Sequence, residues 1–178
     1  MSVGRLVEKK GFDALALLPA TLDWHWTHIG GGTLDCVMRA RAQAAGVADR
    51  ITWRGACDQP DVIEAMRTAD LFVLPSRIAA DGDRDGLPNV LMEAASQLLP
   101  ILSTPVSAIP EFITTGTHGL LATDSADAFA DAMQQIASDP ALGPRLAQAA
   151  HTRLHAEFTM APGIVHLAKR LRGILKTA

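Results

Sequence analysis

The chain has 178 residues, of which 48% are hydrophobic and 20% are charged, and its formal net charge at pH 7 is −3. The length suits one α/β domain with a substantial core, and the composition excludes a disordered chain. The slightly acidic balance argues against a nucleic-acid partner, and no apolar run is long enough to span a bilayer. Because the first residues lack the apolar segment of a signal peptide, we expect a cytoplasmic protein.

Short apolar runs alternate with helical patterns along most of the chain. The alternation predicts a doubly wound parallel sheet, and the uninterrupted apolar run at 71–74 is typical of a strand covered on both faces. The predicted strands are 24–29, 51–53, 71–74, 101–103 and 119–122, and the helices between them are 34–45, 60–69 and 88–97.

The pattern changes after Thr123, where three successive helices are predicted at 125–138, 140–157 and 161–175. Ser125 and the Asp139-Pro140 pair are typical helix starts. We therefore expect one domain over residues 1–178, with a C-terminal helical tail.

The glycines at 30–32 lie between the predicted strand at 24–29 and the predicted helix at 34–45, which is the position of a dinucleotide-binding turn. That fingerprint needs Gly-x-Gly-x-x-Gly, and Asp35 occupies the position of the third glycine. A carboxylate there would lie beside the pyrophosphate, which disfavours a nicotinamide site. A tight turn without a ligand is the alternative.

The two cysteines, Cys36 and Cys57, lack the spacing of a metal site or of a disulfide framework. We expect both to be buried thiols in a reducing compartment.

The most informative segment runs from Asp81 to Glu93, where a Gly-containing loop follows the 71–74 strand and enters a helix at Pro88. In such sheets ligands bind outside the carboxyl ends of the strands, and a helix N-terminus there offers free amides to phosphate. Asp85 precedes the helix, and Glu93 lies about one and a half turns inside it. The two carboxylates could accept hydrogen bonds from sugar hydroxyls. A purely structural role is equally compatible with the sequence. In that case Asp85 is a negative charge that complements the N-terminus of the helix, and Glu93 is solvated or paired.

Near the start, Arg5, Lys9 and Lys10 lie beside Gly11. These cations could neutralise a diphosphate, because Arg offers a planar fork and Lys a mobile point charge. A solvated basic end of a helix is the alternative.

Several segments carry a family resemblance, in sequence order. Residues 4–13 resemble a "GRL…KGF" opening, residues 49–55 a "drV.f.G" strand, residues 69–76 an "aDlfvlPS" strand and residues 85–94 an "EGlPnvllEA" signature. Residues 109–111 and 119–121 continue the order. The pattern is that of the donor domain of group-one glycosyltransferases, a retaining family with two facing Rossmann-like domains, the GT-B fold. The resemblance covers nearly the whole chain.

The resemblance implies a catalytic group of Asp85, Arg5 and Lys10. Arg5 and Lys10 would hold the donor diphosphate and assist its departure, and Asp85 would face the donor sugar. Catalysis would then rest on electrostatic stabilisation of the leaving nucleoside diphosphate by cations. No metal and no cofactor are expected, and the aspartates of the 81–85 loop lack the ligand set of a calcium site.

The resemblance also implies a donor-binding group, in which Glu93 would bind the ribose hydroxyls. Backbone amides at the start of the signature helix would bind the sugar and phosphate, and the base would lie at residues 55–56. The expected donor-binding residues are Gly30, Gly55, Ala56, Gly86, Leu87, Val90 and Glu93.

The chain departs from the family pattern at several positions. Asp85 stands where glutamate is usual, and Leu98 and Ala108 stand where glycines are usual. A non-glycine residue held at positive φ costs roughly 1–2 kcal/mol. We also expect that the N-terminal acceptor domain of the family enzymes is absent.

We therefore expect a donor-binding domain for a nucleotide-diphosphate sugar, which would be transferred to a saccharide or lipid-linked acceptor in envelope or exopolysaccharide synthesis. Alternatives are a non-catalytic nucleotide- or sugar-binding module and a nucleotide-sugar epimerase of the same fold. The isolated chain, without an acceptor domain, is expected to be inactive.

The predicted last helix carries an apolar stripe with interleaved basic residues. It could pack on its own sheet, cross to the acceptor domain, or make a peripheral contact with an anionic membrane. The apolar positions are Ile164, Leu167, Leu171, Ile174 and Leu175.

Overall fold

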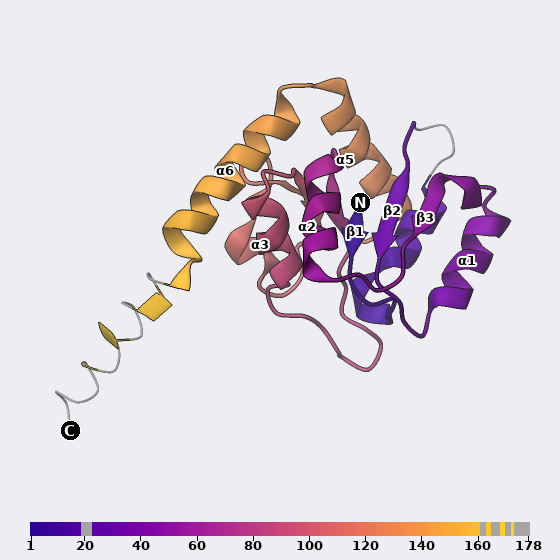
Figure 1. The fold of residues 1–178 in the computed structure, drawn as a ribbon, viewed down its shortest axis with the longest axis horizontal. Coiled ribbons are helices and arrows are strands. Elements are labelled where there is room, and N and C mark those ends of the chain that lie inside the picture. The colour runs from indigo at the N-terminus through magenta and orange to yellow at the C-terminus, as the bar shows by residue number, and fades with distance from the viewer. Residues whose placement is uncertain (19–22, 161–162, 165–167, 170–171, 173–178) are drawn as a thin grey trace.

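The computed structural model describes residues 1–18, 23–160, 163–164, 168–169 and 172. Figure 1 follows the chain through alternating strands and helices to the C-terminal helices. The strands are β1 (Ser2–Val3), β2 (Trp26–Ile29), β3 (Ile51–Trp53), β4 (Phe72–Leu74), β5 (Ile101–Ser103) and β6 (Leu120–Leu121). The α-helices are α1 (Asp35–Ala44), α2 (Gln59–Thr68), α3 (Asn89–Ser96), α4 (Ile109–Phe112), α5 (Ala126–Ser138) and α6 (Leu142–Glu157). Short 3-10 helices are η1 (Glu8–Lys10), η2 (Phe12–Leu17) and η3 (Ala48–Arg50).

The strands form two parallel three-stranded sheets, β1-β2-β3 and β4-β5-β6. At their boundary the Met1 nitrogen donates to the Leu71 carbonyl at 2.6 Å, and the Val73 amide donates to the Met1 carbonyl at 2.8 Å. These two bonds place β1 beside β4, so the strand order across both sheets is β3-β2-β1-β4-β5-β6. This doubly wound order confirms the predicted fold class. Its topological switch point lies between β1 and β4.

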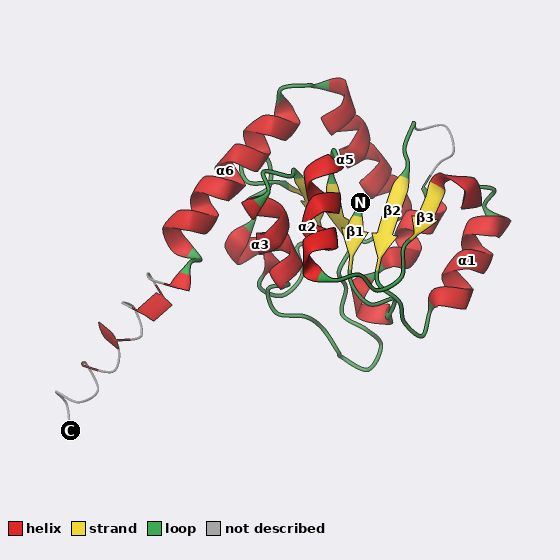
Figure 2. Ribbon diagram, in the orientation of Figure 1, coloured by secondary structure: helices red, strands yellow, loops and turns green. Residues whose placement is uncertain are grey.

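Helices cover the sheet because their apolar sides face it. The strands β4 and β5 are buried at every position, as expected of strands covered on both faces. The helix α3 contacts both strands and packs against α6, whereas η2 contacts α1 and α5. Figure 2 shows the strands of the first sheet between α2 and α1. The largest fully buried side chains include Phe72, Phe112, Phe129, Leu6, Leu15, Met38 and Met66.

Most predicted elements are present, with bounds that shift by at most two residues. The strands at 51–53 and 101–103 have the predicted bounds. Ser125 caps α5 by accepting a hydrogen bond from the Ala128 amide at 3.2 Å. The predictions omitted α4 and the 3-10 helices. The helix η2 is mostly buried and so lacks a helical alternation of polar and apolar residues, whereas α4 has only four residues, too few for such a pattern. The helix predicted at 161–175 lies largely outside the described residues.

Two predictions about single residues were wrong. Cys36 is exposed and Cys57 is half-buried. The reason is that α1 turns Met38 and Ala42 toward the core, which leaves Cys36 on its solvent side. None of the helices in the described part of the chain has the length and apolar character needed to cross a membrane.

The two glycine replacements have different outcomes. Leu98 has a φ of 56°, so this position does require the left-handed conformation that favours glycine. Ala108 has a φ of −89°, and the expectation of positive φ there was wrong. The left-handed residue is its neighbour Ser107, with a φ of 52°.

Candidate functional site

The two loops at the topological switch point meet backbone to backbone. The chain leaves β1, passes through η1 and turns at Gly11, which has a φ of 63°. A Cβ atom on Gly11 would lie 1.8 Å from the carbonyl oxygen of Pro75, so only glycine fits there. The Arg77 amide also donates to the Lys9 carbonyl at 2.9 Å. The turn at residues 8–11 is therefore fixed against the loop that follows β4.

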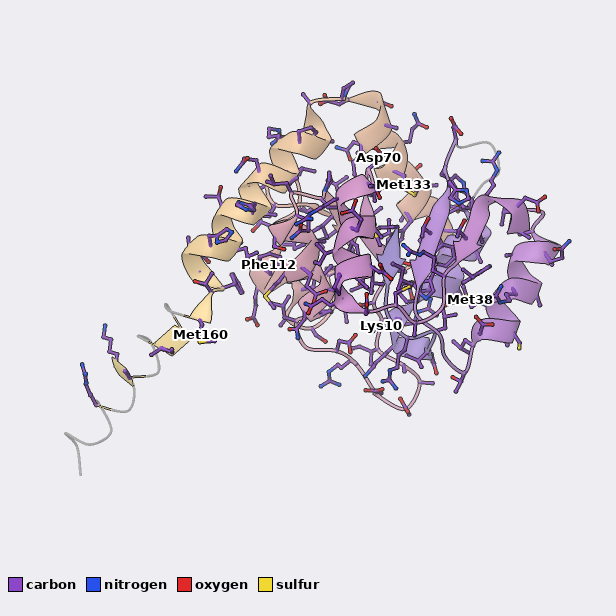
Figure 3. The ribbon with its side chains drawn as sticks, viewed as in Figure 1. Lys10, Met38, Asp70, Phe112, Met133 and Met160 are labelled. Carbon is purple, nitrogen blue, oxygen red and sulfur yellow. The ribbon has the colours of Figure 1, made fainter. Side chains whose placement is uncertain are left out.

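This contact brings the predicted cations and carboxylates together. Lys10 Nζ lies 2.6 Å from Asp85 Oδ2, and Lys9 Nζ lies 3.4 Å from Asp85 Oδ1. Lys9 Nζ also lies 3.0 Å from Asp83 Oδ1. The two lysine side chains are only 15% and 14% exposed. Figure 3 shows Lys10 at the edge of the domain toward which the arrows of β1 to β3 point in Figure 2.

The lysines control the charge of Asp85. Burial by itself would raise the pKa of this carboxyl group. The hydrogen bond and charge of Lys10, followed by the charge of Lys9, outweigh burial and hold the Asp85 pKa below its ordinary value. The hydrogen bond to Asp83 raises the pKa of Lys9. Lys9 and Asp85 are therefore both charged at neutral pH.

Arg77, in the loop after β4, contacts the segment after β1 and the loop after β6. Its guanidinium lies 2.8 Å from Asp13 Oδ1 and 2.8 Å from Asp124 Oδ2, and it donates to the Gly11 carbonyl at 3.2 Å. Burial raises the pKa of Asp124, and the Arg77 charge partly opposes this shift. The sequence analysis did not single out Arg77. No local motif signals it, because its partners come from distant parts of the chain.

The helix α3 starts beside the charged cluster. Asp85 lies in the loop ahead of it, and Glu93 is half-buried on the helix, which agrees with the predicted placement of both carboxylates. Gly86 and Leu87 donate no backbone hydrogen bond to any described residue, so their amides are free. Val90, in the first turn of α3, packs against the core.

The predicted donor-binding residues Gly30 and Gly55 meet at the carboxyl ends of β2 and β3. The Gly30 amide donates to the Gly55 carbonyl at 2.7 Å. A Cβ atom on Gly30 would lie 1.9 Å from the Gly4 carbonyl oxygen, and one on Gly32 would lie 2.4 Å from the Leu6 carbonyl oxygen. Close backbone packing therefore requires these two glycines. Next to Gly55, Ala56 is exposed.

The structure separates one predicted residue from the rest. Arg5 is exposed, and among the residues described it forms no ion pair and no side-chain hydrogen bond. Lys10 and Asp85 are in direct contact, although Lys10 was predicted to hold the diphosphate and Asp85 to face the donor sugar. Lys9 lies between the carboxylates of Asp83 and Asp85, so it belongs to the charged cluster as Lys10 does.

Comparisons with known proteins identify the family and the fold of this chain. A family model described as "Glycosyl transferases group 1" matches residues 1–139. The amylovoran biosynthesis glycosyltransferase AmsK of Erwinia amylovora is 32% identical over 176 residues, which cover 96% of this chain and 42% of AmsK. The chain thus spans less than half the length of that relative.

Solved structures share the fold. The C-terminal domain of a glycosyl transferase group 1 family protein, LpcC, from Francisella tularensis has a TM-score of 0.76 at 21% identity, covering 89% of this chain and 85% of that one. Anabaena HepE, solved in complex with UDP, has a TM-score of 0.76 at 18% identity, covering 99% of this chain and 49% of HepE. The fold is that of a GT-B C-terminal domain. The chain belongs to the group 1 family of glycosyl transferases.

Proposed function

We propose that this domain binds the nucleotide-diphosphate sugar donor of a retaining glycosyltransferase. The observation that carries the proposal is the pair of half-buried lysines at the topological switch point, next to the free amides of Gly86 and Leu87. Cations beside free amides form a suitable site for a diphosphate. The UDP bound to HepE, which shares the fold, supports the same ligand class.

The remaining roles follow from position. Lys10 and Arg5 neutralise the diphosphate, Arg5 by swinging inward from its exposed position. Glu93 accepts hydrogen bonds from the ribose hydroxyls, and Asp85 faces the donor sugar. The base lies along Gly55 and Ala56, near Gly30. When the bond between the anomeric carbon and the phosphate oxygen breaks, the electron pair leaves with the diphosphate, where the cations stabilise it.

The neutralising charge comes from side chains, so binding requires no metal. The test is calorimetry with UDP, GDP and ADP, each with and without a chelator. We expect one of the diphosphates to bind equally well in both conditions. Binding that disappears in the chelator would contradict the role of the lysines, and the absence of binding by all three would refute the proposal.

The acceptor is a saccharide or a lipid-linked saccharide in envelope or exopolysaccharide synthesis, as the name of AmsK suggests for that relative. An acceptor has to be positioned by a facing domain, and orientation contributes up to ~7–11 kcal/mol to such reactions. We therefore propose that the 178-residue chain transfers no sugar by itself. Acceptor-dependent turnover by the purified chain would refute this point. Release of an epimerised sugar nucleotide without acceptor would favour an epimerase instead.

We also propose a cytoplasmic location with peripheral membrane contact through the C-terminal segment. Ile164 is 58% exposed, and Lys169 and Arg172 are exposed. A basic and apolar surface of this kind binds anionic lipids. Co-sedimentation with anionic vesicles at low salt, compared with a chain ending at Met160, tests the contact. Equal sedimentation of both chains would refute it.

A further inference from the structure

Three contacts attach the loop after β4 to the cationic turn at residues 8–10. The first is the ion pair between Lys9 Nζ and Asp83 Oδ1, at 3.0 Å. In the second, the Ala80 amide donates to Glu8 Oε1 at 2.9 Å, and in the third the Arg77 amide donates to the Lys9 carbonyl at 2.9 Å. These contacts hold the Asp83 carboxylate against the ammonium group of Lys9.

The charges within this cluster are balanced before any ligand enters. Lys10 is paired with Asp85, and Lys9 is shared by Asp85 and Asp83. A diphosphate that approaches the lysines therefore meets two carboxylates already bound to them. The diphosphate has to displace at least one of these carboxylates, because negative charges that share the same lysines repel each other.

Asp83 is the carboxylate that can be displaced more easily. Its side chain is 56% exposed, whereas that of Asp85 is 21% exposed and lies between two lysines. An exposed carboxylate that leaves its partner returns to water at little cost. The Asp83 backbone is held separately, by the Ala79 amide and the Asp81 side chain, so the loop keeps its shape when the carboxylate turns away.

We infer that Asp83 is an internal competitor of the donor diphosphate, and that Lys9 is a further phosphate-binding cation which Asp83 releases when the donor binds. This inference rests on the proposed function. Asp83 then sets how tightly the domain holds its donor, although it does not touch the reacting atoms. Removing its charge should strengthen diphosphate binding, whereas removal of a residue that binds the donor would weaken it.

The test is calorimetry on the 178-residue chain with UDP, GDP, ADP and the matching nucleosides. We expect Asp83→Asn to tighten diphosphate binding by roughly threefold to fivefold, the effect of an ion pair of this exposure. Nucleoside affinity should not change, because a nucleoside has no phosphate to compete for Lys9. Asp131→Asn is the matched control, since Asp131 is exposed on α5 and forms no ion pair with any described residue. It removes the same charge and should leave both affinities unchanged.

A second pair of variants identifies the cation. Lys9→Met should weaken diphosphate binding more strongly in the Asp83→Asn background than in the unmodified chain, because only in that background is Lys9 released from the Asp83 carboxylate before the diphosphate binds. Equal effects in both backgrounds would overturn the inference. So would an unchanged diphosphate affinity in Asp83→Asn, or an equal gain for the nucleoside.

Asp83→Ser provides a second neutral variant, and thermal melts confirm that each variant is folded. If no diphosphate binds to either protein, the proposed function fails and the inference falls with it. If the unmodified chain binds and the variant binds no better, only the inference fails.

Discussion

The buried histidine of β2 makes the stability of this domain depend on pH. His28 is fully buried, and its ring lies 4.7 Å from that of Phe12 and 5.8 Å from that of Trp53. The Trp26 indole donates to Ser2 Oγ at 2.7 Å, and Ser2 Oγ in turn lies 2.8 Å from His28 Nδ1, within hydrogen-bond distance. Burial outweighs a hydrogen bond with the Gly4 backbone and the charge of Asp35, both of which favour the protonated ring. The site therefore favours the neutral ring.

Burial lowers the pKa of His28 from its ordinary value of 6.5 to about 4. Between these two values the unfolded chain binds a proton that the folded chain does not, so acid favours unfolding. The contribution of the neutral ring is fully present above pH 6.5 and is lost as the pH falls toward 4. The expected loss is about 2 kcal/mol at pH 5 and about 3 kcal/mol at pH 4.

The assay is urea denaturation at pH 7.5, 6.5, 5.5 and 4.5 for the unmodified chain, His28→Gln and His25→Gln. His28→Gln should be less stable at neutral pH, because the glutamine side chain does not fill the space of the imidazole ring. It should lose much less stability on acidification, because glutamine does not bind a proton in this pH range. His25 is exposed and directly precedes β2, and its variant should follow the unmodified chain. If the difference in unfolding free energy between the unmodified chain and His28→Gln stays constant over this pH range, the reasoning is refuted.

Three further predictions concern strained backbone and the two signature carboxylates. At position 98, where φ is 56°, the glycine variant should be about 1 kcal/mol more stable than the alanine variant in denaturation, and the reverse order would contradict the left-handed conformation. Gly30→Ala should destabilise the domain by roughly 2 kcal/mol or more through overlap with a backbone carbonyl, whereas Gly31→Ala, with no atom within 4 Å of the new Cβ, should melt like the unmodified chain. In a full-length enzyme with this domain, Glu93→Ala should weaken nucleotide binding by roughly 1.5–3 kcal/mol. Asp85→Ala should chiefly lower turnover, and equal losses of affinity in both would contradict the assigned roles.

The sequence was sufficient for the secondary structure because the signals involved are local. Apolar runs, helix caps such as Ser125 and glycines at sharp turns act over a few residues, and they predicted most of the strands and the longer helices. The signature segment likewise placed Asp85 ahead of a helix and Glu93 inside it. Local patterns were less reliable where burial removes the polar and apolar alternation, as in η2.

Backbone strain shows where local reasoning reaches its limit. The sequence pointed to Leu98 and Ala108 as replaced glycines, and only Leu98 has positive φ. A replaced glycine shows where a tight turn is needed. Which residue takes the unusual conformation depends on how the turn packs, and here it is Ser107.

The tertiary structure alone decided how the charges of the candidate site are paired. Lys9 and Asp83 are 74 residues apart, and Arg77 reaches Asp124 across 47 residues. Such pairs form because the strand order brings the loops after β1, β4 and β6 to one edge of the sheet, and strand order is set by the packing of the whole core. The sequence by itself identified the residues that carry charge. It did not determine that Lys10 contacts Asp85, because that contact exists only when β1 lies beside β4.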